Sequence, residues 1–339
     1  MVDKIAPNDP RMERKTVSVR GRTYSYLLFN PSGPAADTIV LLHGFPDISL
    51  AWRYQVPVLL ALNLRVVVPD NLGYGHTDAP HDVSHYATKA LADDMVELAA
   101  SVVGSGVPFL VGGHDWGSAL AGRVALWHPQ LVKALFLVCV PYMPPREGGA
   151  TLEDIVRAGA LPNFQYQLQF IGPDVEREIQ GKVKIRQFLS CIYGGWSEEG
   201  KRGFSVEHGV LFDRLEGMSP PELLSAEELD YYVDEFARNG MRGPLNWYRT
   251  GKLNVADEAP LLEKPEALRL KMPVLFVAAS RDAAVPPAMS AGMDQWVENL
   301  TRAEVDASHW VLWEKPEDFN GHLKTWLEKS VLGKEKASL

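Results

Sequence analysis

The chain of 339 residues is longer than the size at which one apolar core keeps growing, which predicts a single domain with a large insertion, or two lobes. Hydrophobic residues make up 46% of the chain and charged residues 23%, a balance that is typical of globular proteins and excludes a disordered or membrane-embedded one. The formal net charge is −9, and the sequence shows no stripe of lysine and arginine residues that would concentrate positive charge on one face. Nucleic acid is therefore not expected as a partner.

The cysteines and the chain ends bear on the compartment. Cys139 lies in the apolar run 134–140, where a free thiol behaves as a small hydrophobic side chain, and this favours a reducing compartment. Residues 1–15 hold no apolar signal region, and no apolar run approaches the ~18 residues of a membrane span. We therefore expect a soluble cytoplasmic protein. The tail 337–339 resembles a peroxisomal signal but lacks its basic middle residue, so a peroxisomal location is not supported.

Short β-rich runs alternate with helical patterns through the first half of the chain. The later runs are almost continuously apolar, as strands buried on both sides of a parallel sheet are. A helical pattern at 86–103 illustrates the strand-helix-strand order of an α/β fold. We predict a mostly parallel central sheet with helices on both faces. The predicted strands in this half are 16–20, 24–29, 38–42, 64–69, 108–111 and 134–140.

The alternation of strand and helix patterns stops after the sixth predicted strand. Residues 141–268 are typical of helices and loops, and strand character returns only at 273–279 and 303–305. The sequence therefore predicts a core of residues 1–140 and 269–339, with 141–268 inserted as a helical cap.

One helix of the insertion has clear end signals. Ser225 and Glu228 form a capping box ahead of a helical apolar face. Gly240 is expected to end that helix, and Gly243-Pro244 to start the next.

Residues 113–117, Gly-His-Asp-Trp-Gly, follow an apolar strand and precede a small-residue helix at 118–125. This is the strand-turn-helix context of a nucleophile elbow, with Asp115 in the place of the usual serine. The turn needs glycines because Cβ atoms two residues to either side of the nucleophile would clash. The alternative is that Asp115 only caps the following helix.

A second motif, His43-Gly44-Phe45-Pro46-Asp47, follows the third predicted strand directly. In this kind of fold that loop supplies one backbone N–H of the oxyanion hole, so Phe45 and Trp116 are the predicted donors. Pro46 has no N–H and can hold a cis bond, which indicates that it shapes the turn. His43 is expected to be a structural hydrogen-bonding residue.

Two more side chains follow the last strands. Asp282 comes after 273–279 and His309 after 303–305, at the carboxyl ends where open α/β sheets place their sites. The order nucleophile, acid, histidine fits an elbow hydrolase, with His309 as base and Asp282 as its orienting acid. Asp70 is a rival acid at a strand end, but it precedes the elbow, and its alternative role is to cap a turn.

These motifs together, HGFPD at 43–47, GGHDWGS at 112–118, Asp282 and the SHW around His309, resemble the soluble epoxide hydrolases of the α/β-hydrolase superfamily. The resemblance spans nearly the whole chain. It implies an α/β-hydrolase fold, and it implies an aspartate nucleophile that opens an epoxide and forms an ester.

The resemblance also implies two lid tyrosines. The segments Asn-Phe-Gln-Tyr-Gln-Leu at 163–168 and Gly-Pro-Leu-Asn-Trp-Tyr-Arg at 243–249 match that pattern, which carries the role over to Tyr166 and Tyr248. The chain departs from the family at Ser308, where glycine often precedes the histidine.

The residue pattern around the two tyrosines also predicts a cavity lining, independently of the resemblance. Apolar side chains at 164, 166, 168 and 170 alternate with glutamines, so they would share one face of an extended segment lining a cavity. Tyr248 is expected one turn into a helix started by Pro244. The alternative is that both tyrosines simply pack within the lid. The predicted pocket residues are Phe164, Leu168, Phe170, Trp247, Pro46 and Asp47.

This set predicts the hydrolysis of lipophilic epoxides to vicinal diols. Asp115 would form an ester, the two phenols would bind the leaving oxygen, and His309 would activate the water that cleaves the ester. No metal-ligand cluster or dinucleotide motif appears, so no metal and no cofactor is expected beside the epoxide and water. The sequence says nothing about oligomeric state.

Two alternatives stay open. Haloalkane and haloacid dehalogenases also use an elbow aspartate, and Trp116 could be a halide-binding indole. Against this, the haloalkane enzymes usually carry asparagine at the position of Phe45, and the fluoroacetate type carries arginine at that of Trp116. The other alternative is a non-catalytic ligand receptor on the same fold.

Overall fold

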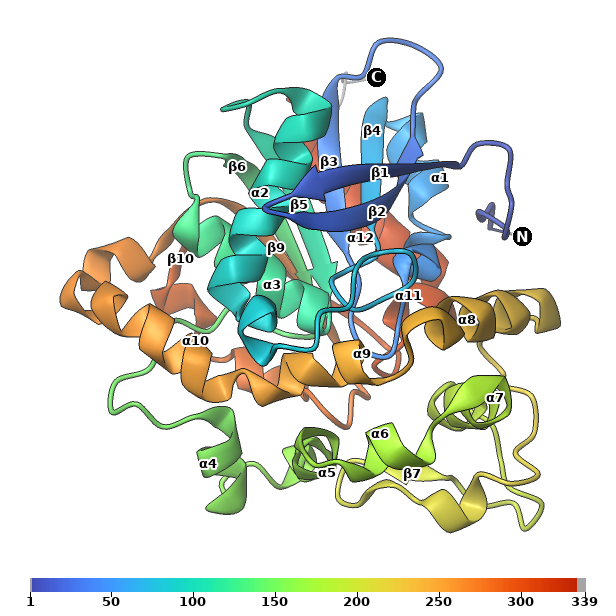
Figure 1. Ribbon diagram of the computed structural model, residues 1–339. Coiled ribbons are helices and arrows are strands. Elements are labelled where there is room, and N and C mark those ends of the chain that lie inside the picture. Colours follow the sequence, from blue (N-terminus) through green and yellow to red (C-terminus); the bar gives the residue numbers. More distant parts are fainter. Residues whose placement is uncertain (1, 334–339) are drawn as a thin grey trace.

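The computed structural model describes residues 2–333, and the tail signal considered above, 337–339, lies outside them. Its centre is a twisted eight-stranded sheet in the order β1-β2-β4-β3-β5-β6-β9-β10. The first two strands run antiparallel, and from β4 to β10 all neighbours are parallel (Figure 1). The strands are β1 (Glu13–Val19), β2 (Arg22–Phe29), β3 (Asp37–Leu42), β4 (Leu64–Pro69), β5 (Phe109–His114), β6 (Val132–Val138), β9 (Leu270–Ala279) and β10 (Val297–Val305).

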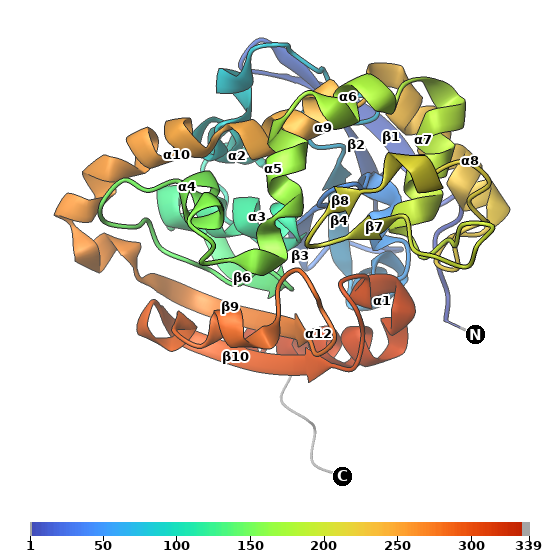
Figure 2. The same ribbon diagram turned by 90° about the horizontal axis from the view of Figure 1, so that it is seen from below.

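Every strand predicted from the sequence overlaps a strand of this sheet, and the α/β fold class is confirmed. The central strands are apolar because both of their faces are covered: every residue of β5 is buried, and only Lys133 of β6 is exposed. Helices α2 (Thr88–Val103) and α3 (Trp116–Trp127) pack together on one face of the sheet. Helices α1 (Val56–Ala61) and α12 (Pro316–Ser330) lie on the other face (Figures 1 and 2).

Between β6 and β9 the chain forms a helical layer beside the carboxyl ends of the parallel strands (Figure 1). The prediction of helices and loops holds there except for a small two-stranded sheet that the sequence did not reveal, because strands of two residues carry no periodic signal. The elements of this layer are α4 (Leu152–Arg157), α5 (Tyr166–Ile171), α6 (Asp174–Glu178), α7 (Gly181–Ile192), β7 (Phe204–Ser205), β8 (Gly209–Val210), α8 (Ala226–Asn239), α9 (Arg242–Asn246) and α10 (Gly251–Glu258).

Short 3-10 turns and one short helix join the elements of the core and of the helical layer. They are η1 (Ser49–Trp52), η2 (Val83–Tyr86), η3 (Pro162–Phe164), η4 (Phe212–Arg214), η5 (Trp247–Arg249), η6 (Ala259–Glu263), η7 (Pro265–Leu268), η8 (Pro287–Ser290), η9 (Met293–Gln295) and α11 (Val311–Glu314). The predicted capping box is present at the start of α8, where Ser225 and Glu228 cap each other, and Gly240 ends the helix with a positive φ. Among residues 2–333 no helix has the length and apolar character that crossing a membrane requires.

Two local predictions for this layer are wrong. Residues 166–171 form helix α5 rather than an extended segment, with Tyr166 and Phe170 one turn apart on its buried side and Leu168 only half-buried. Alternation over seven residues also fits a short helix, and the packing of the buried side decides between the two. Tyr248 was expected one turn into a helix started by Pro244. Helix α9 instead begins at Arg242, two residues before the proline, and ends at Asn246, so Tyr248 lies in the 3-10 turn η5 that follows it.

Candidate active site

The nucleophile elbow lies between β5 and α3. Asp115 has φ 54° and ψ −123°, a backbone conformation that non-glycine residues rarely adopt. A Cβ on Gly113 would lie 2.0 Å from the Gly117 carbonyl oxygen, and one on Gly117 would lie 2.0 Å from that of Leu42. Only glycine fits at either position. The Asp115 side chain makes no capping hydrogen bond to α3, which argues against the capping alternative.

Backbone donors surround the Asp115 carboxylate. The Phe45 N–H donates to Asp115 Oδ1 over 2.8 Å, and the Trp116 N–H lies close enough to lower the pKa of this carboxylate. Burial alone would raise the pKa of Asp115, but His309 and the Trp116 N–H outweigh burial and hold the pKa below its ordinary value. Asp115 is therefore ionised near neutral pH and lies between the two predicted oxyanion-hole donors.

His309 connects the two carboxylates. Its Nδ1 lies 2.6 Å from Asp282 Oδ2 and its Nε2 lies 3.4 Å from Asp115 Oδ2. The N–H groups of Ala284 and Val285 both donate to Asp282 Oδ1 over 2.9 Å. Burial would raise the pKa of Asp282, but the charge of His309 and these N–H groups lower it strongly. Burial would lower the pKa of His309, but the two carboxylates raise it well above its ordinary value.

Ser308 does not displace this histidine. Its backbone N–H donates to Glu314 Oε2 over 2.9 Å, and its hydroxyl donates to the other carboxylate oxygen. The serine thus binds to helix α11 and leaves His309 directed at Asp115.

The competing residues are engaged elsewhere. His43 Nε2 accepts the N–H of Asn71, and burial lowers the pKa of His43 to about 4, so it is neutral and structural as predicted. Asp70 pairs with Arg14 over 3.0 Å and accepts the N–H of Ser49. It therefore stabilises the loops after β3 and β4.

His114, Cys139 and His309 lie close enough to suggest a metal site. However, His114 Nε2 donates to the His309 carbonyl oxygen over 2.8 Å, and the Cys139 thiol approaches the same oxygen at 3.6 Å. Both ring nitrogens of His309 face carboxylates. Among the described residues this group therefore supports the His309 loop.

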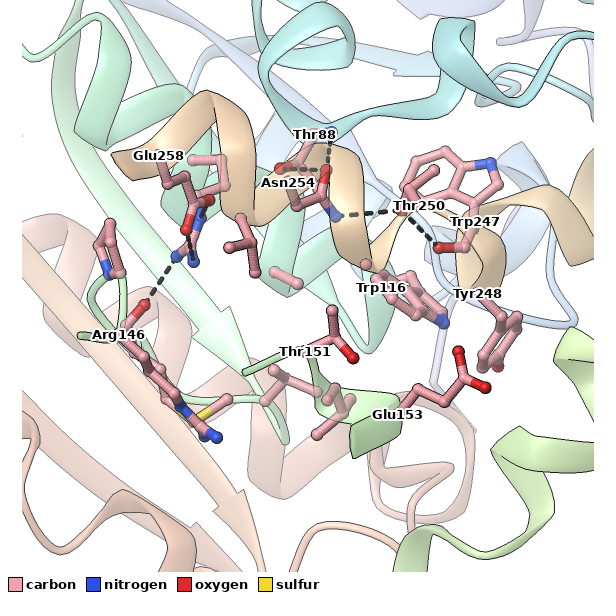
Figure 3. Close-up of a pocket in the computed structure, with 18 of the residues that line it drawn as sticks. Thr88, Trp116, Arg146, Thr151, Glu153, Trp247, Tyr248, Thr250, Asn254 and Glu258 are labelled. Atoms are coloured by element: carbon pink, nitrogen blue, oxygen red, sulfur yellow. Dashed lines mark hydrogen bonds and ion pairs between the residues drawn. The ribbon is translucent and has the colours of Figure 1, made fainter. Parts of the chain in front are cut away.

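Asp115 lines a cavity of about 510 Å³. Figure 3 shows this cavity, with Trp116 and Tyr248 among the side chains that line it. Tyr166 and Tyr248 line it from different elements, α5 and η5. Their rings contact Phe170 from two sides, at centroid distances of 5.3 and 5.2 Å. Burial raises the pKa of both phenols above the ordinary value, so both are neutral hydrogen-bond donors near neutral pH.

Of the predicted pocket residues, Phe164 and Trp247 line this cavity. Leu168 and Phe170 do not, because the helical turn of α5 directs Gln167 and Ile171 to the cavity instead. The prediction for this pair is therefore wrong.

Pro46 and Asp47 also lie outside the cavity lining, contrary to the prediction. The Phe45–Pro46 bond is cis, as the proline suggested, and the loop turns inward beneath α7 and α8. Tyr193, directly after α7, donates to the Pro46 carbonyl, and Tyr232 of α8 donates to Asp47 Oδ1 over 2.8 Å. Burial raises the pKa of Asp47 to about 7.

Sequence reasoning did not find several polar residues of the cavity. Thr88 comes from α2, Asn254 and Glu258 from α10, and Arg123 from α3. Arg123 Nε and Glu258 Oε1 form an ion pair at 2.5 Å. The spacing of Asn254 and Glu258, four residues apart on one helix face, was the only available signal, and it does not reveal what the face contacts.

Residues 37–169 and 202–316 match the family described as alpha/beta hydrolase fold. The chain is 42% identical over 339 residues to the epoxide hydrolase srdG of Neurospora crassa, covering 96% of this chain and 98% of that one. It is 32% identical to the bifunctional epoxide hydrolase 2 of Rattus norvegicus, covering 96% of this chain and 57% of that one. The crystal structure of epoxide hydrolase A from Mycobacterium thermoresistibile superposes with a TM-score of 0.76 at 26% identity, covering 94% of this chain and 98% of that one.

The sheet, the elbow and the family match define the protein as an α/β hydrolase. The relatives identify its family within that class. The chain belongs to the epoxide hydrolases, which are hydrolases acting on ether bonds.

Proposed function

We propose that the chain converts lipophilic epoxides to vicinal diols through a covalent ester on Asp115. The observation that carries this proposal is one cavity lined by an ionised carboxylate and two neutral buried phenols, with a histidine nitrogen 3.4 Å from that carboxylate. Residues 141–268 would act as the cap that supplies the phenols. The cytoplasmic location and the domain boundaries stay predictions.

In the first step, an oxygen of Asp115 attacks one epoxide carbon from the side opposite its C–O bond. That bond breaks, its electron pair moves to the oxygen, and a C–O ester bond forms on Asp115. Tyr166 and Tyr248 stabilise the developing alkoxide by hydrogen bonding and supply its proton. Their raised pKa keeps them protonated before the attack.

In the second step, Asp115 no longer carries a negative charge, because its carboxylate is now an ester. His309 then loses the partner that lay 3.4 Å from its Nε2, so its pKa falls and it releases its proton, which returns through solvent to the tyrosine that protonated the alkoxide. The neutral ring can then accept a proton from water. The hydroxide attacks the ester carbonyl carbon. The oxyanion that results accepts hydrogen bonds from the N–H groups of Phe45 and Trp116. It collapses by breaking the C–O bond to the alkyl group, whose oxygen takes a proton from His309 as the diol leaves, and the carboxyl group of Asp115 then returns a proton to His309.

A single turnover in heavy-oxygen water tests this route. The attacking water oxygen should enter Asp115, so the first diol should be unlabelled and peptide mass spectrometry should find the label on that aspartate. Label in the first diol would show direct attack by water and would contradict the ester.

The dehalogenase alternative has limited support in this cavity. Trp247 Nε1 donates to the Leu72 carbonyl oxygen over 3.0 Å and is not free for a halide, although Trp116 lines the cavity. Halide release from chloroalkanes without diol formation from epoxides would favour that alternative. Ligand binding without turnover of any epoxide would favour the receptor.

A further inference from the structure

Tyr248 lies in a turn that has few hydrogen bonds of its own. It is the central residue of η5, a three-residue 3-10 segment between α9 and α10. Segments this short hold few internal hydrogen bonds, so outside partners must fix the backbone. One such partner binds the peptide group that joins Trp247 to Tyr248.

The carbonyl oxygen of that peptide accepts a hydrogen bond from the Thr250 hydroxyl at 3.0 Å. Thr250 is completely buried, and its hydroxyl oxygen in turn accepts Asn254 Nδ2 at 3.0 Å (Figure 3). Because the Thr250 proton is committed to Trp247, the amide of Asn254 sets the direction of the hydroxyl.

Asn254 is itself attached to the core. Its Oδ1 accepts both the backbone N–H of Thr88, at 2.8 Å, and the Thr88 hydroxyl, at 3.2 Å (Figure 3). Thr88 is the first residue of α2, and Ala87 before it provides no side-chain cap. Asn254 thus satisfies one of the free N–H groups that every helix start leaves, although it lies 166 residues away in the sequence.

We propose that Thr88, Asn254 and Thr250 form a positioning relay that fixes the Tyr248 hydroxyl for ring opening. The relay runs from the amino end of α2 to the Trp247 carbonyl, and each donor in it has one acceptor. The inference rests on the proposed role of Tyr248. It assigns no contact with substrate to Thr250 and Asn254, which act through the tyrosine.

The relay is separate from two other anchors of the turn. The Trp247 side chain donates to the Leu72 carbonyl oxygen over 3.0 Å. Arg249 donates to the carbonyl oxygens of Ile171 and Gly172 at the end of α5, and so ties the turn to the segment that carries Tyr166. The relay ties the same turn to the core beneath it. Loss of the relay should therefore disturb Tyr248 relative to Asp115 and leave Tyr166 in place.

The kinetic test is a double-mutant cycle with styrene oxide on the full chain. Thr250→Val removes the hydroxyl and keeps the shape. It should slow ester formation on Asp115, followed by quenched-flow mass spectrometry, about tenfold, and the change in a Tyr248→Phe background should be less than about twofold. Ester hydrolysis should change little in either background. Thr250→Ser restores the hydroxyl and should recover most of the rate.

Thr38→Val is the matched control, because Thr38 is a buried threonine of β3 outside the cavity lining. Equal slowing by Thr250→Val with and without Tyr248, or no slowing, would overturn the relay. If Thr250→Val does not fold, Asn254→Asp gives the same test, since it keeps an acceptor for Thr88 and loses the donor to Thr250.

A spectroscopic arm does not depend on turnover. The chain has 11 tyrosines, and ring carbon-13 labelling with the Tyr248→Phe variant identifies the signal of Tyr248. Thr250→Val should shift or broaden that signal and leave the signal of Tyr166 unchanged. If the parent forms no ester from styrene oxide, the proposed function fails, while an unmoved Tyr248 signal would overturn the relay independently.

Discussion

Neutralising Asp115 should change the protonation of His309, and Asp115→Asn isolates this effect. The substitution removes the negative charge that lies 3.4 Å from His309 Nε2 and keeps the shape of the side chain, as ester formation would. At an effective dielectric constant of about 20, a unit charge at that distance contributes about 5 kcal/mol. Asp282 remains, so the pKa of His309 should fall without losing its whole upward shift.

Histidine ring NMR signals recorded against pH measure this change, and His309→Gln identifies the signal. In the parent, His309 should stay protonated through neutral pH, and in Asp115→Asn its titration should move to lower pH. Asp306→Asn is the control, because that carboxylate lies three residues from His309 but is largely exposed and pairs with Arg281. Identical titration of His309 in the parent and in Asp115→Asn would refute the electrostatic account of how the base is released.

Three further predictions follow from distances and burial in the site. Tyr166→Phe and Tyr248→Phe each remove one donor to the developing alkoxide and should lower the rate of ester formation about 100-fold without lowering Tm, and an unchanged rate would remove that phenol from the mechanism. Gly117→Ala places a Cβ 2.0 Å from the Leu42 carbonyl oxygen and should cost about 3 kcal/mol in urea unfolding, whereas unaltered stability would contradict the tight elbow. Asp282 has a lowered pKa when folded, so its ion pair stabilises the fold above its unfolded pKa of about 4 and is lost as the pH falls through the folded value. Unfolding at a series of pH values should show Asp282→Asn weakening the protein most near neutrality, and a constant difference down to acid pH would contradict this.

Deletion of the Arg123–Glu258 ion pair tests the far end of the cavity. Arg123 is half-buried and also donates to the Met143 carbonyl oxygen, so Arg123→Met leaves the carboxylate of Glu258 without its partner. Removing one partner of a largely buried pair should lower the free energy of unfolding by about 3 kcal/mol. Arg123→Met combined with Glu258→Gln should recover part of that loss in urea unfolding, and no recovery would show that the packing of the arginine stem matters more than its charge.

The sequence determined the parts of this site that depend on local geometry. The glycines around Asp115 are needed by a turn that leaves no room for Cβ atoms, so their spacing identified the elbow. Asp282 and His309 were found because parallel strands bring their carboxyl ends to one edge of the sheet, whatever the loops do. The strands themselves were readable because burial on both faces demands continuous apolar runs.

Only the tertiary structure decided which side chains surround the substrate space. Four apolar residues at alternate positions from 164 to 170 fit an extended segment and a short helix equally well, and the packing of Tyr166 and Phe170 selected the helix. The contact between Thr88 and Asn254 joins α2 to α10 across a sequence separation of 166 residues. Local periodicity reports which face of an element is buried, whereas the identity of its neighbour depends on how distant elements pack.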